Sequence, residues 1–590
     1  MAGQFVKNGA TLKCPLCSSS GTLVVSHTQV QLQDTPCATN GDKSKSNLVF
    51  GGVCKKWRKS PPPCASVIAP TQWKGVATDV EIDGEFMLLE DSTITCSTGG
   101  VDIGIEDTAQ MDVPTDLPDT ENAVLKKFLV NVRRPDDYKG EYGFDWLRDE
   151  YIYPIETIAY DNLGLDGTLQ SAPLINQQLP VCKNPEDLKN EYKTKDVVNP
   201  ITPYGAAYYP AWLSIFPNTS YSGVNEVQLN IEVEEIEPLV SDATEIIFES
   251  ANDSLIITPA QIPLNELLGK KQSKNLGTSS KEFYTTEKII TVKCEGSGLE
   301  NHEEIKIYAE LNGEKEEVGK LMVYKNSEIP NAEIVIVKAT YQEQLVLNPT
   351  YQNAIKYQSL NQALINTEIS VIVEDFRIED LPEEDEHVEY FISKFITPSP
   401  QEVWGNNPAY GGVYQNEEIY VDKVREFKDY LIYLYEKYGE NGPSTYYLSA
   451  TGHYKTYLFY TPIAPVFTMK PLVQFRGIAC AHENENSNTI EWGNAVIVFG
   501  GDLLNNFVTV HELGHSFSLP HSFEERMSSP FIFYRGFTDN YMDYDNLTQP
   551  DITKTQVESK FEGNMHSFFK WQWDIMRGDK SLVYNNTDIE

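Results

Sequence analysis

Apolar and polar residues alternate with a period of two through much of the chain before residue 331, which is the pattern of strands that bury one face. Such runs lie at residues 125–132, 226–233, 288–294, 304–310 and 318–324. Glycine, proline and polar residues separate them at the short spacing typical of antiparallel sheets. The pattern therefore predicts a β-rich N-terminal part made of sandwich-like domains.

The pattern changes near Ala332. Short apolar runs at residues 333–339, 368–374 and 494–499 are typical of buried strands. Residues 417–438 instead place apolar side chains at helical spacing, at Val421, Val424, Phe427, Leu431, Leu434 and Tyr438. Because strands and helices alternate along this part of the chain, we expect an α/β fold.

Residues 108–122 are polar, contain two prolines and show no periodicity, so we interpret them as a linker. With the change of pattern after residue 330, the chain divides into four predicted domains: an all-β module at 1–110, a β-sandwich at 111–250, an immunoglobulin-like β-sandwich at 251–330 and an α/β domain at 331–590. A chain of 590 residues is too long for one hydrophobic core, which favours a multidomain organisation.

The α/β domain contains the strongest candidate chemistry, because residues 511–521 read His-Glu-Leu-Gly-His-Ser-Phe-Ser-Leu-Pro-His. On a helix, His511 and His515 share one face, where two imidazoles can bind one Zn²⁺. The proline before His521 ends the helix, so the chain turns and brings a third imidazole back. Three histidine ligands leave the fourth position of zinc to water, and Glu512 is placed to act as its general base.

These residues resemble the metzincin zinc peptidases, whose pattern is His-Glu-x-x-His-x-x-Gly-x-x-His followed by a methionine turn. Residues 540–544, Asn-Tyr-Met-Asp-Tyr, resemble that turn. The resemblance implies that the three histidines bind catalytic zinc and that Met542 forms the apolar floor beneath it. It also implies that Tyr544 approaches the metal and stabilises an oxyanion. A zinc metalloendopeptidase is therefore the expected activity.

Ser518 stands where the family has glycine, and a left-handed backbone there costs about 1 kcal/mol or more for a residue with a Cβ. The family also places its active-site helix after a strand of the sheet, here residues 494–499, and Asp502 can cap that helix. We expect this last strand to be the sheet edge. An extended peptide substrate would add to it through main-chain hydrogen bonds.

Six of the nine cysteines lie in the first 110 residues. Cys14 and Cys17 form a CxxC pair, but no second CxxC follows, so a zinc ribbon is not supported. Three interpretations remain open: a structural metal bound by this pair with His27 or other thiols, disulfides such as Cys54 to Cys64, or free buried thiols.

Five short segments lie in this part of the chain in a characteristic order and spacing: Gly9–Cys14, Asn47–Cys54, Pro61–Cys64, Gln72–Trp73 and Ser92–Gly100. In this order and spacing, this part of the chain resembles the PAAR-like proteins, which form a β-rich cone at the tip of the spike of type VI secretion systems and related contractile injection machines. The resemblance implies a VgrG-type trimeric spike as the partner, in some members a metal at the point, and often a toxin as the C-terminal extension.

The chain holds 86 acidic and 47 basic residues, a formal net charge of −39, of which the first 110 residues carry only −2. This charge disfavours nucleic acid and anionic membrane surfaces as partners. No apolar run reaches about 18 residues and the N-terminus has no apolar core. We therefore expect no stable membrane anchor and no signal peptide, with synthesis in a bacterial cytoplasm.

These expectations combine into one hypothesis: a secreted type VI effector with a spike-tip module, two β spacers and a zinc peptidase toxin that hydrolyses peptide bonds in a target cell. Such a toxin implies a cognate immunity protein in the producer. One alternative is a peptidoglycan amidase or peptidase that acts on stem peptides with the same zinc. The other is a non-catalytic spike extension or adhesin, for which Glu512→Ala would leave competitive killing unchanged.

Overall fold

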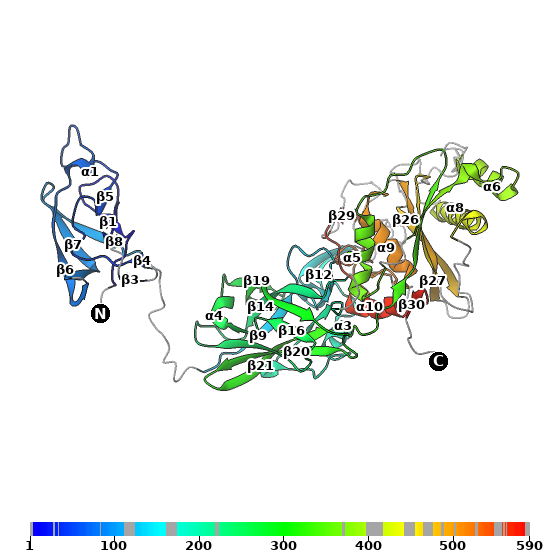
Figure 1. The fold of residues 1–590 in the computed structure, drawn as a ribbon, viewed down its shortest axis with the longest axis horizontal. Coiled ribbons are helices and arrows are strands. Elements are labelled where there is room, and N and C mark those ends of the chain that lie inside the picture. The colour runs from blue at the N-terminus through cyan, green and yellow to red at the C-terminus, as the bar shows by residue number, and fades with distance from the viewer. Residues whose placement is uncertain are drawn as a thin grey trace. The chain divides into compact units, whose positions relative to one another are not determined.

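The computed structural model shows a multidomain, β-rich protein that divides into two compact units, residues 1–118 and residues 119–590 (Figure 1). The residues that the structure describes are 4–26, 30–32, 35–82, 84–110, 124–160, 174–218, 223–367, 372–396, 417–441, 455–463, 476–484, 489–500, 503–524, 529–544, 546–547, 557–558, 561 and 563–584. No helix within these ranges is long and apolar enough to cross a membrane.

The first unit is built on a six-stranded antiparallel sheet in the order β5-β2-β1-β8-β7-β6. Its strands are β1 Thr11–Lys13, β2 Gly21–Leu23, β5 Leu48–Phe50, β6 Pro70–Ile82, β7 Glu85–Cys96 and β8 Val101–Asp107. The pair β3 Gln31–Leu32 and β4 Thr35–Pro36 and the one-turn helix α1 Cys64–Val67 complete it. In β7, Ile94 and Cys96 are buried between partly exposed threonines, so the period-two pattern faces one side into a small core.

A single eleven-stranded sheet forms most of the β-rich part of the second unit, residues 124–330. Its strands are β9 Phe128–Arg133, β10 Gly143–Asp145, β13 Ala211–Ser214, β14 Glu226–Glu235, β15 Glu245–Ser250, β16 Leu255–Thr258, β17 Gln261–Pro263, β18 Gln272–Asn275, β19 Ser280–Cys294, β20 Glu303–Leu311 and β21 Glu314–Val323. The main path runs β16-β19-β14-β9-β21-β20-β15-β17.

The boundary predicted at residue 250 does not separate two domains. Strands β14 and β15 precede it, yet β14 pairs with β19 and β15 pairs with β20. The first half of the sheet, β16-β19-β14-β9, and the second half, β21-β20-β15-β17, therefore both mix strands from the two predicted sandwiches. Residues of both halves belong to one hydrophobic core. The halves join where Val130 of β9 meets Gly319 of β21, at a distance so short that any side chain at Gly319 would clash with the Val130 carbonyl oxygen.

The α/β part, residues 331–584, contains a five-stranded sheet in the order β24-β23-β25-β27-β26. Its strands are β23 Ile334–Thr340, β24 Ile372–Arg377, β25 Thr456–Thr461, β26 Gly477–Asn484 and β27 Thr489–Phe499. Four strands are parallel and β26 runs antiparallel to β27. The expectation that residues 494–499 form the sheet edge is therefore wrong, because β26 covers that side of β27 and is itself the edge.

Helices cover both faces of this sheet (Figure 1). Ile334 and Ile336 of β23 enter one core with α5 Tyr351–Tyr357 and α9 Asn506–Ser516, whereas Val335 and Val337 enter a second core with α6 Glu386–Phe391 and α8 Glu417–Tyr438. Successive side chains point to opposite faces, so a continuous apolar run is the pattern that a strand buried on both faces requires. The helix predicted at 417–438 is confirmed.

Shorter elements connect these layers. They are α2 Asp149–Ile152, α3 Pro185–Lys193, α4 Leu264–Leu267, α10 Lys570–Arg577, the 3₁₀ turns η1 Pro203–Gly205, η2 Leu360–Ala363 and η3 Ile378–Asp380, and the π-helical turn η4 Ile392–Ile396. Three two-stranded ribbons join β11 Glu156–Tyr160 to β12 Leu174–Leu179, β22 Asn331–Ala332 to β30 Leu582–Val583, and β28 Asn546–Leu547 to β29 Val557–Glu558.

The core beneath α9 is shared with the β-rich part. Tyr324 follows β21, and its ring centroid lies 5.7 Å from that of Trp573 on α10 and 6.5 Å from that of Trp212 on β13. All three side chains are almost fully buried. The predicted boundary at residue 331 therefore divides one continuous hydrophobic core.

We expect residues 119–590 to fold as an independent unit and residues 331–590 alone to fail. The shorter fragment would expose Trp573 and its neighbours, and each large buried aromatic side chain contributes about 3 kcal/mol or more. Thermal unfolding followed by circular dichroism measures both fragments. A cooperative transition of residues 331–590 at the same temperature as that of residues 119–590 would contradict the shared core.

Candidate metal centre

Helix α9 places the candidate metal ligands. It begins after Asn505, whose side-chain oxygen accepts a hydrogen bond from the backbone N–H of Phe507 at 3.0 Å. The expected cap, Asp502, lies outside the described residues. Val510 and Leu513 pack into the core on the rear face of the helix, which leaves the histidine face toward the turn that follows.

The three predicted histidines converge on one point. Nε2 of His521 lies 3.1 Å from Nε2 of His511 and 3.1 Å from Nε2 of His515. Around a tetrahedral zinc ion, ligand nitrogens are about 3.3 Å apart. Among the described residues, this histidine triad is the one group of three or more His, Cys, Asp or Glu ligands with all ligand atoms within 4.8 Å of one another. The triad can therefore bind a metal ion.

The other ring nitrogen of each histidine fixes its orientation. Nδ1 of His511 donates to the carbonyl oxygen of Tyr541 at 2.7 Å, and Nδ1 of His515 donates to that of Leu519 at 2.7 Å. A carbonyl only accepts hydrogen bonds, so the proton resides on Nδ1 and the Nε2 lone pair faces the common centre. Nδ1 of His521 lies 3.2 Å from a carboxylate oxygen of Glu524.

Burial favours the neutral, metal-binding form of two of these imidazoles. His511, His515 and His521 expose only 5%, 3% and 8% of their surface. Burial lowers the pKa of His511 and of His515 well below its usual value, and the neighbouring imidazole of His521 lowers both further. Neutral imidazoles that point their lone pairs at one another gain a favourable partner only when a cation lies between them.

Ser518 has the left-handed backbone that the family's glycine position implies, with φ of 69°. The chain turns there because the N–H of Ser518 donates to the carbonyl of His515 at 2.9 Å and that of Leu519 donates to the carbonyl of Gly514 at 3.0 Å. The hydroxyl of Ser518 also donates to the carboxylate of Asp579. The turn geometry is therefore retained with serine.

The methionine turn, residues 540–543, lies beneath the triad. The N–H of Asp543 donates to the carbonyl of Asn540 at 3.1 Å, and the Asn540 side-chain oxygen accepts from the N–H of Met542 at 2.8 Å. Met542 is fully buried, and a Cβ at Gly514 would clash with its sulfur. Glycine on α9 therefore lets Met542 approach the helix, which is the position expected for it.

Glu512 is buried beside the triad, against the first residue of the edge strand β26. A Cβ built at Gly477 would lie 2.5 Å from Cγ of Glu512, so only glycine leaves room for this carboxylate. Burial raises the pKa of Glu512 to about 8, although Arg476 acts in the opposite direction. A bound cation would favour the ionised carboxylate, which is the form that accepts a proton.

Tyr544 lies next to the histidines, as expected. Its ring centroid is 5.0 Å from that of His521 and 5.5 Å from that of His511. The guanidinium of Arg535 lies 4.0 Å from the same ring. Burial raises the pKa of Tyr544 despite this cation, so its phenol stays protonated and can donate a hydrogen bond.

Three neighbours of the site were not predicted. Gly477 makes room for Glu512, Trp492 of β27 stacks on His515 at 4.2 Å between ring centroids, and Arg535 covers Tyr544. None of them has a fixed spacing from residues 511–521, so only the pairing of β26 with β27 and the turn before residue 540 bring them together. In the sequence, the one signal for these neighbours was Gly477, a glycine with no evident role at the start of a short apolar run.

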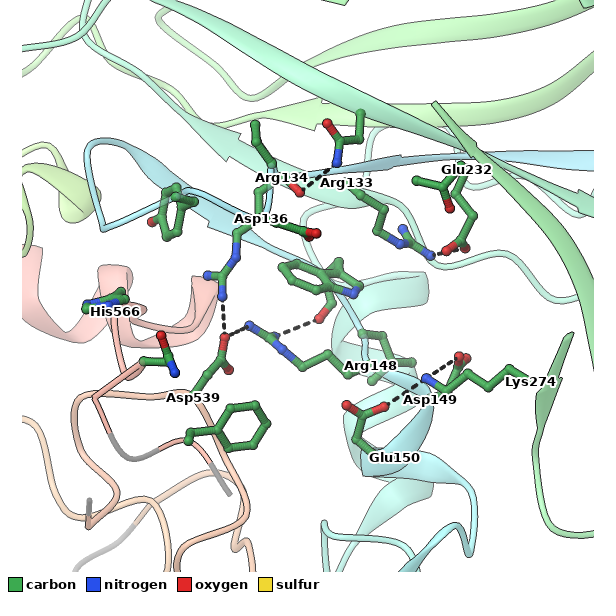
Figure 2. Close-up of a pocket in the computed structure, with 18 of the residues that line it drawn as sticks. Arg133, Arg134, Asp136, Arg148, Asp149, Glu150, Glu232, Lys274, Asp539 and His566 are labelled. Carbon is green, nitrogen blue, oxygen red and sulfur yellow. Dashed lines mark hydrogen bonds and ion pairs between the residues drawn. The ribbon is translucent and has the colours of Figure 1, made fainter. Parts of the chain in front are cut away.

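A buried ion cluster links the methionine turn to the β-rich part. The carboxylate of Asp539 accepts from Arg134 at 2.6 Å, from Arg148 at 2.9 Å and from the hydroxyl of Tyr151 at 3.2 Å. Figure 2 shows both arginines converging on Asp539 from the β-rich part, at the wall of a pocket of about 470 Å³. Although burial alone raises the pKa of Asp539, the two arginines hold it well below its usual range.

The nine cysteines are all buried free thiols in this structure. Cys17 pairs with Cys54 across an antiparallel bridge, and burial together with the nearby Cys17 thiol raises the pKa of Cys64 to about 12. Among the described residues, no three of these thiols have sulfur atoms that all lie within 4.8 Å of one another, which is the spacing of the histidine triad. His27 lies outside the described residues.

Comparison with known proteins adds one finding for the first unit. Residues 6–110 match the model of a family described as a domain of unknown function (DUF4280). The match coincides with the module expected at residues 1–110. No curated protein matches the chain.

We expect Asp539→Ala to destabilise residues 119–590 by about 3–5 kcal/mol, because it removes the carboxylate that pairs with partly buried Arg134 and one of the two carboxylates, with that of Asp145, that pair with buried Arg148. Chemical denaturation measures this loss. Asp137→Ala is the matched control, since it removes an exposed ion pair with Lys288 and should change stability little. Equal effects of the two substitutions would show that the buried cluster is not important for stability.

Proposed function

We propose that this protein is an effector of a contractile injection machine whose C-terminal part is a zinc-dependent peptidase of the metzincin type. One observation carries the proposal: Nε2 of His521 lies 3.1 Å from Nε2 of both His511 and His515, all three rings are buried, and a buried glutamate lies beside them. Ordinary polar helix residues would have no reason to point their lone pairs at one another in a hydrophobic core.

The donor set fits zinc. Three imidazole nitrogens with an open fourth position are the ligands of catalytic rather than structural zinc sites. When bound, zinc would supply a Lewis acid and lower the pKa of a water molecule. Glu512 would accept a proton from that water and later deliver it to the leaving amine, and the phenol of Tyr544 would donate to the developing oxyanion.

The sheet edge supports a peptide as the substrate. In the described part of the chain, β27 is the only strand that pairs with β26, so the other side of β26 offers main-chain groups to an extended peptide. Gly477 begins this strand and contacts Glu512. A peptide that extends the sheet at β26 would therefore pass close to the general base. The chemistry accommodates both proteins and peptidoglycan stem peptides.

The first unit supports delivery by a spike. It is an all-β module with its own core, and it precedes the segment that we interpret as a linker. Its resemblance to PAAR-like spike-tip proteins would give it a VgrG-type trimeric spike as partner. On this proposal, the protein is loaded in the bacterial cytoplasm, injected into a target cell and neutralised in its producer by an immunity protein.

We expect Glu512→Gln to reduce cleavage of unfolded protein by residues 119–590 about 100-fold or more, because the amide cannot accept the proton. Bound zinc and thermal stability should stay unchanged. Cleavage of fluorescently labelled casein measures the rate, and Glu389→Gln, on an exposed part of α6, is the control. Equal rates for the wild type and Glu512→Gln would contradict a peptidase. Activity on purified peptidoglycan alone would assign the substrate to stem peptides.

We also expect Gly477→Ala to reduce cleavage while the three histidines still bind zinc, because the three atoms nearest to the added methyl group all belong to Glu512, which it displaces. The control is Gly269→Ala, where a Cβ meets no atom within 4 Å. Loss of zinc together with activity would show that Gly477 supports the metal site as a whole.

A further inference from the structure

A loop of the first unit carries positive charge that the proposed function does not use. Residues 55–59 read Lys-Lys-Trp-Arg-Lys, and all five are exposed. We call Lys55–Lys59 the basic loop. Its Trp57 exposes 40% of its surface, although tryptophan is normally well buried in a folded domain. In a chain with a net charge of −39, four basic residues within five positions are a strong local departure.

The basic loop projects from a fixed base. The N–H of Lys55 donates to the carbonyl of Leu16 at 2.7 Å, and that of Cys54 donates to the carbonyl of Pro62 at 2.9 Å. Val53 and Pro63 then pair across an antiparallel bridge. Both ends of the loop are therefore anchored at one place on the domain, and these backbone contacts fix the position from which Trp57 is exposed.

The charges of the basic loop have no internal counter-ions. Among the described residues, no acidic side chain forms an ion pair with Lys55, Lys56, Arg58 or Lys59. Other exposed lysines of the same unit do have such partners, since Lys13 pairs with Glu106 and Lys74 with Asp102. The basic loop thus presents its charge outward instead of neutralising it.

The charge lies at one end of the unit. Lys56 donates to the carbonyl of Thr98, in the turn between β7 and β8. Glu81 and Glu85 flank the hairpin between β6 and β7, at the opposite end of β7. A strand of 12 residues is about 40 Å long. This distance exceeds the screening length of about 10 Å at 0.1 M salt, so Glu81 and Glu85 are screened from a surface that meets the basic loop. Asp102, which follows the turn that Lys56 contacts, is paired with Lys74.

We infer that the basic loop docks reversibly on an anionic phospholipid bilayer. Clustered lysine and arginine side chains are attracted to anionic headgroups, and a tryptophan among them occupies the interface between headgroups and acyl chains. A single exposed aromatic ring on a short protruding loop fits this flat, chemically repetitive surface. It lacks the series of stacking side chains with which proteins bind single-stranded nucleic acid. The first 110 residues carry a net charge of only −2, so the unit that bears the loop adds little repulsion of its own.

The test uses the full chain and sedimentation with vesicles. We expect binding to vesicles of phosphatidylglycerol mixed with phosphatidylcholine, loss of binding at high salt, and little binding to phosphatidylcholine alone. Each basic residue near the surface contributes about a fivefold change in affinity, so Lys55→Glu with Lys59→Glu should weaken binding by at least about 25-fold. Trp57→Ala should weaken it severalfold. Circular dichroism checks that each variant is folded.

The matched control reverses two lysines elsewhere in the same unit, Lys13→Glu with Lys74→Glu, which changes the net charge by the same amount. It should leave vesicle binding nearly unchanged. Equal loss in the control and loop variants would overturn the proposal, as would equal binding to both lipid compositions. A basic loop that instead recognises an acidic protein would leave the full chain unbound to vesicles, and that result would also overturn it.

Discussion

The orientation of three buried imidazoles is the constraint on which the rest of the second unit depends. Nε2 of His521 lies 3.1 Å from Nε2 of each of the other two rings, and the backbone carbonyls of Tyr541 and Leu519 fix the protons of those two rings on Nδ1. A different segment of the chain positions each of these two carbonyl groups. Leu519 follows the left-handed turn at Ser518, and Tyr541 lies in the methionine turn next to the Asp539 ion cluster. The β-rich part therefore helps to position the histidine triad, and one hydrophobic core crosses residue 331.

The same arrangement connects the histidine triad with the edge of the sheet. Strand β26 turns the last parallel strand into an internal one and brings its own edge to Glu512. Burial raises the pKa of Glu512 and so disfavours its ionised form. A metal ion next to the carboxylate would favour the ionised form again. The first unit has a separate core and a family match of its own.

Local patterns in the sequence predicted the local geometry well. Helical spacing gave His511 and His515 a common face, whereas the backbone of Ser518, at the position where the metzincin pattern has glycine, was left open and is left-handed in the structure. Long-range pairing was not predictable in this way. Strands β14 and β19 combine the two expected sandwiches although about sixty residues separate their partners, and Arg148 contacts Asp539 across 391 positions. The edge strand was missed because residues 477–484 do not alternate apolar and polar side chains.

Zinc K-edge X-ray absorption on residues 119–590, which lack the six N-terminal cysteines, tests the central claim most directly. The histidine triad predicts one zinc per chain with imidazole nitrogens and one oxygen at about 2.0–2.1 Å, and a loss of that zinc in His515→Ala. Absence of zinc, or a shell of sulfur ligands at about 2.3 Å, would contradict the account.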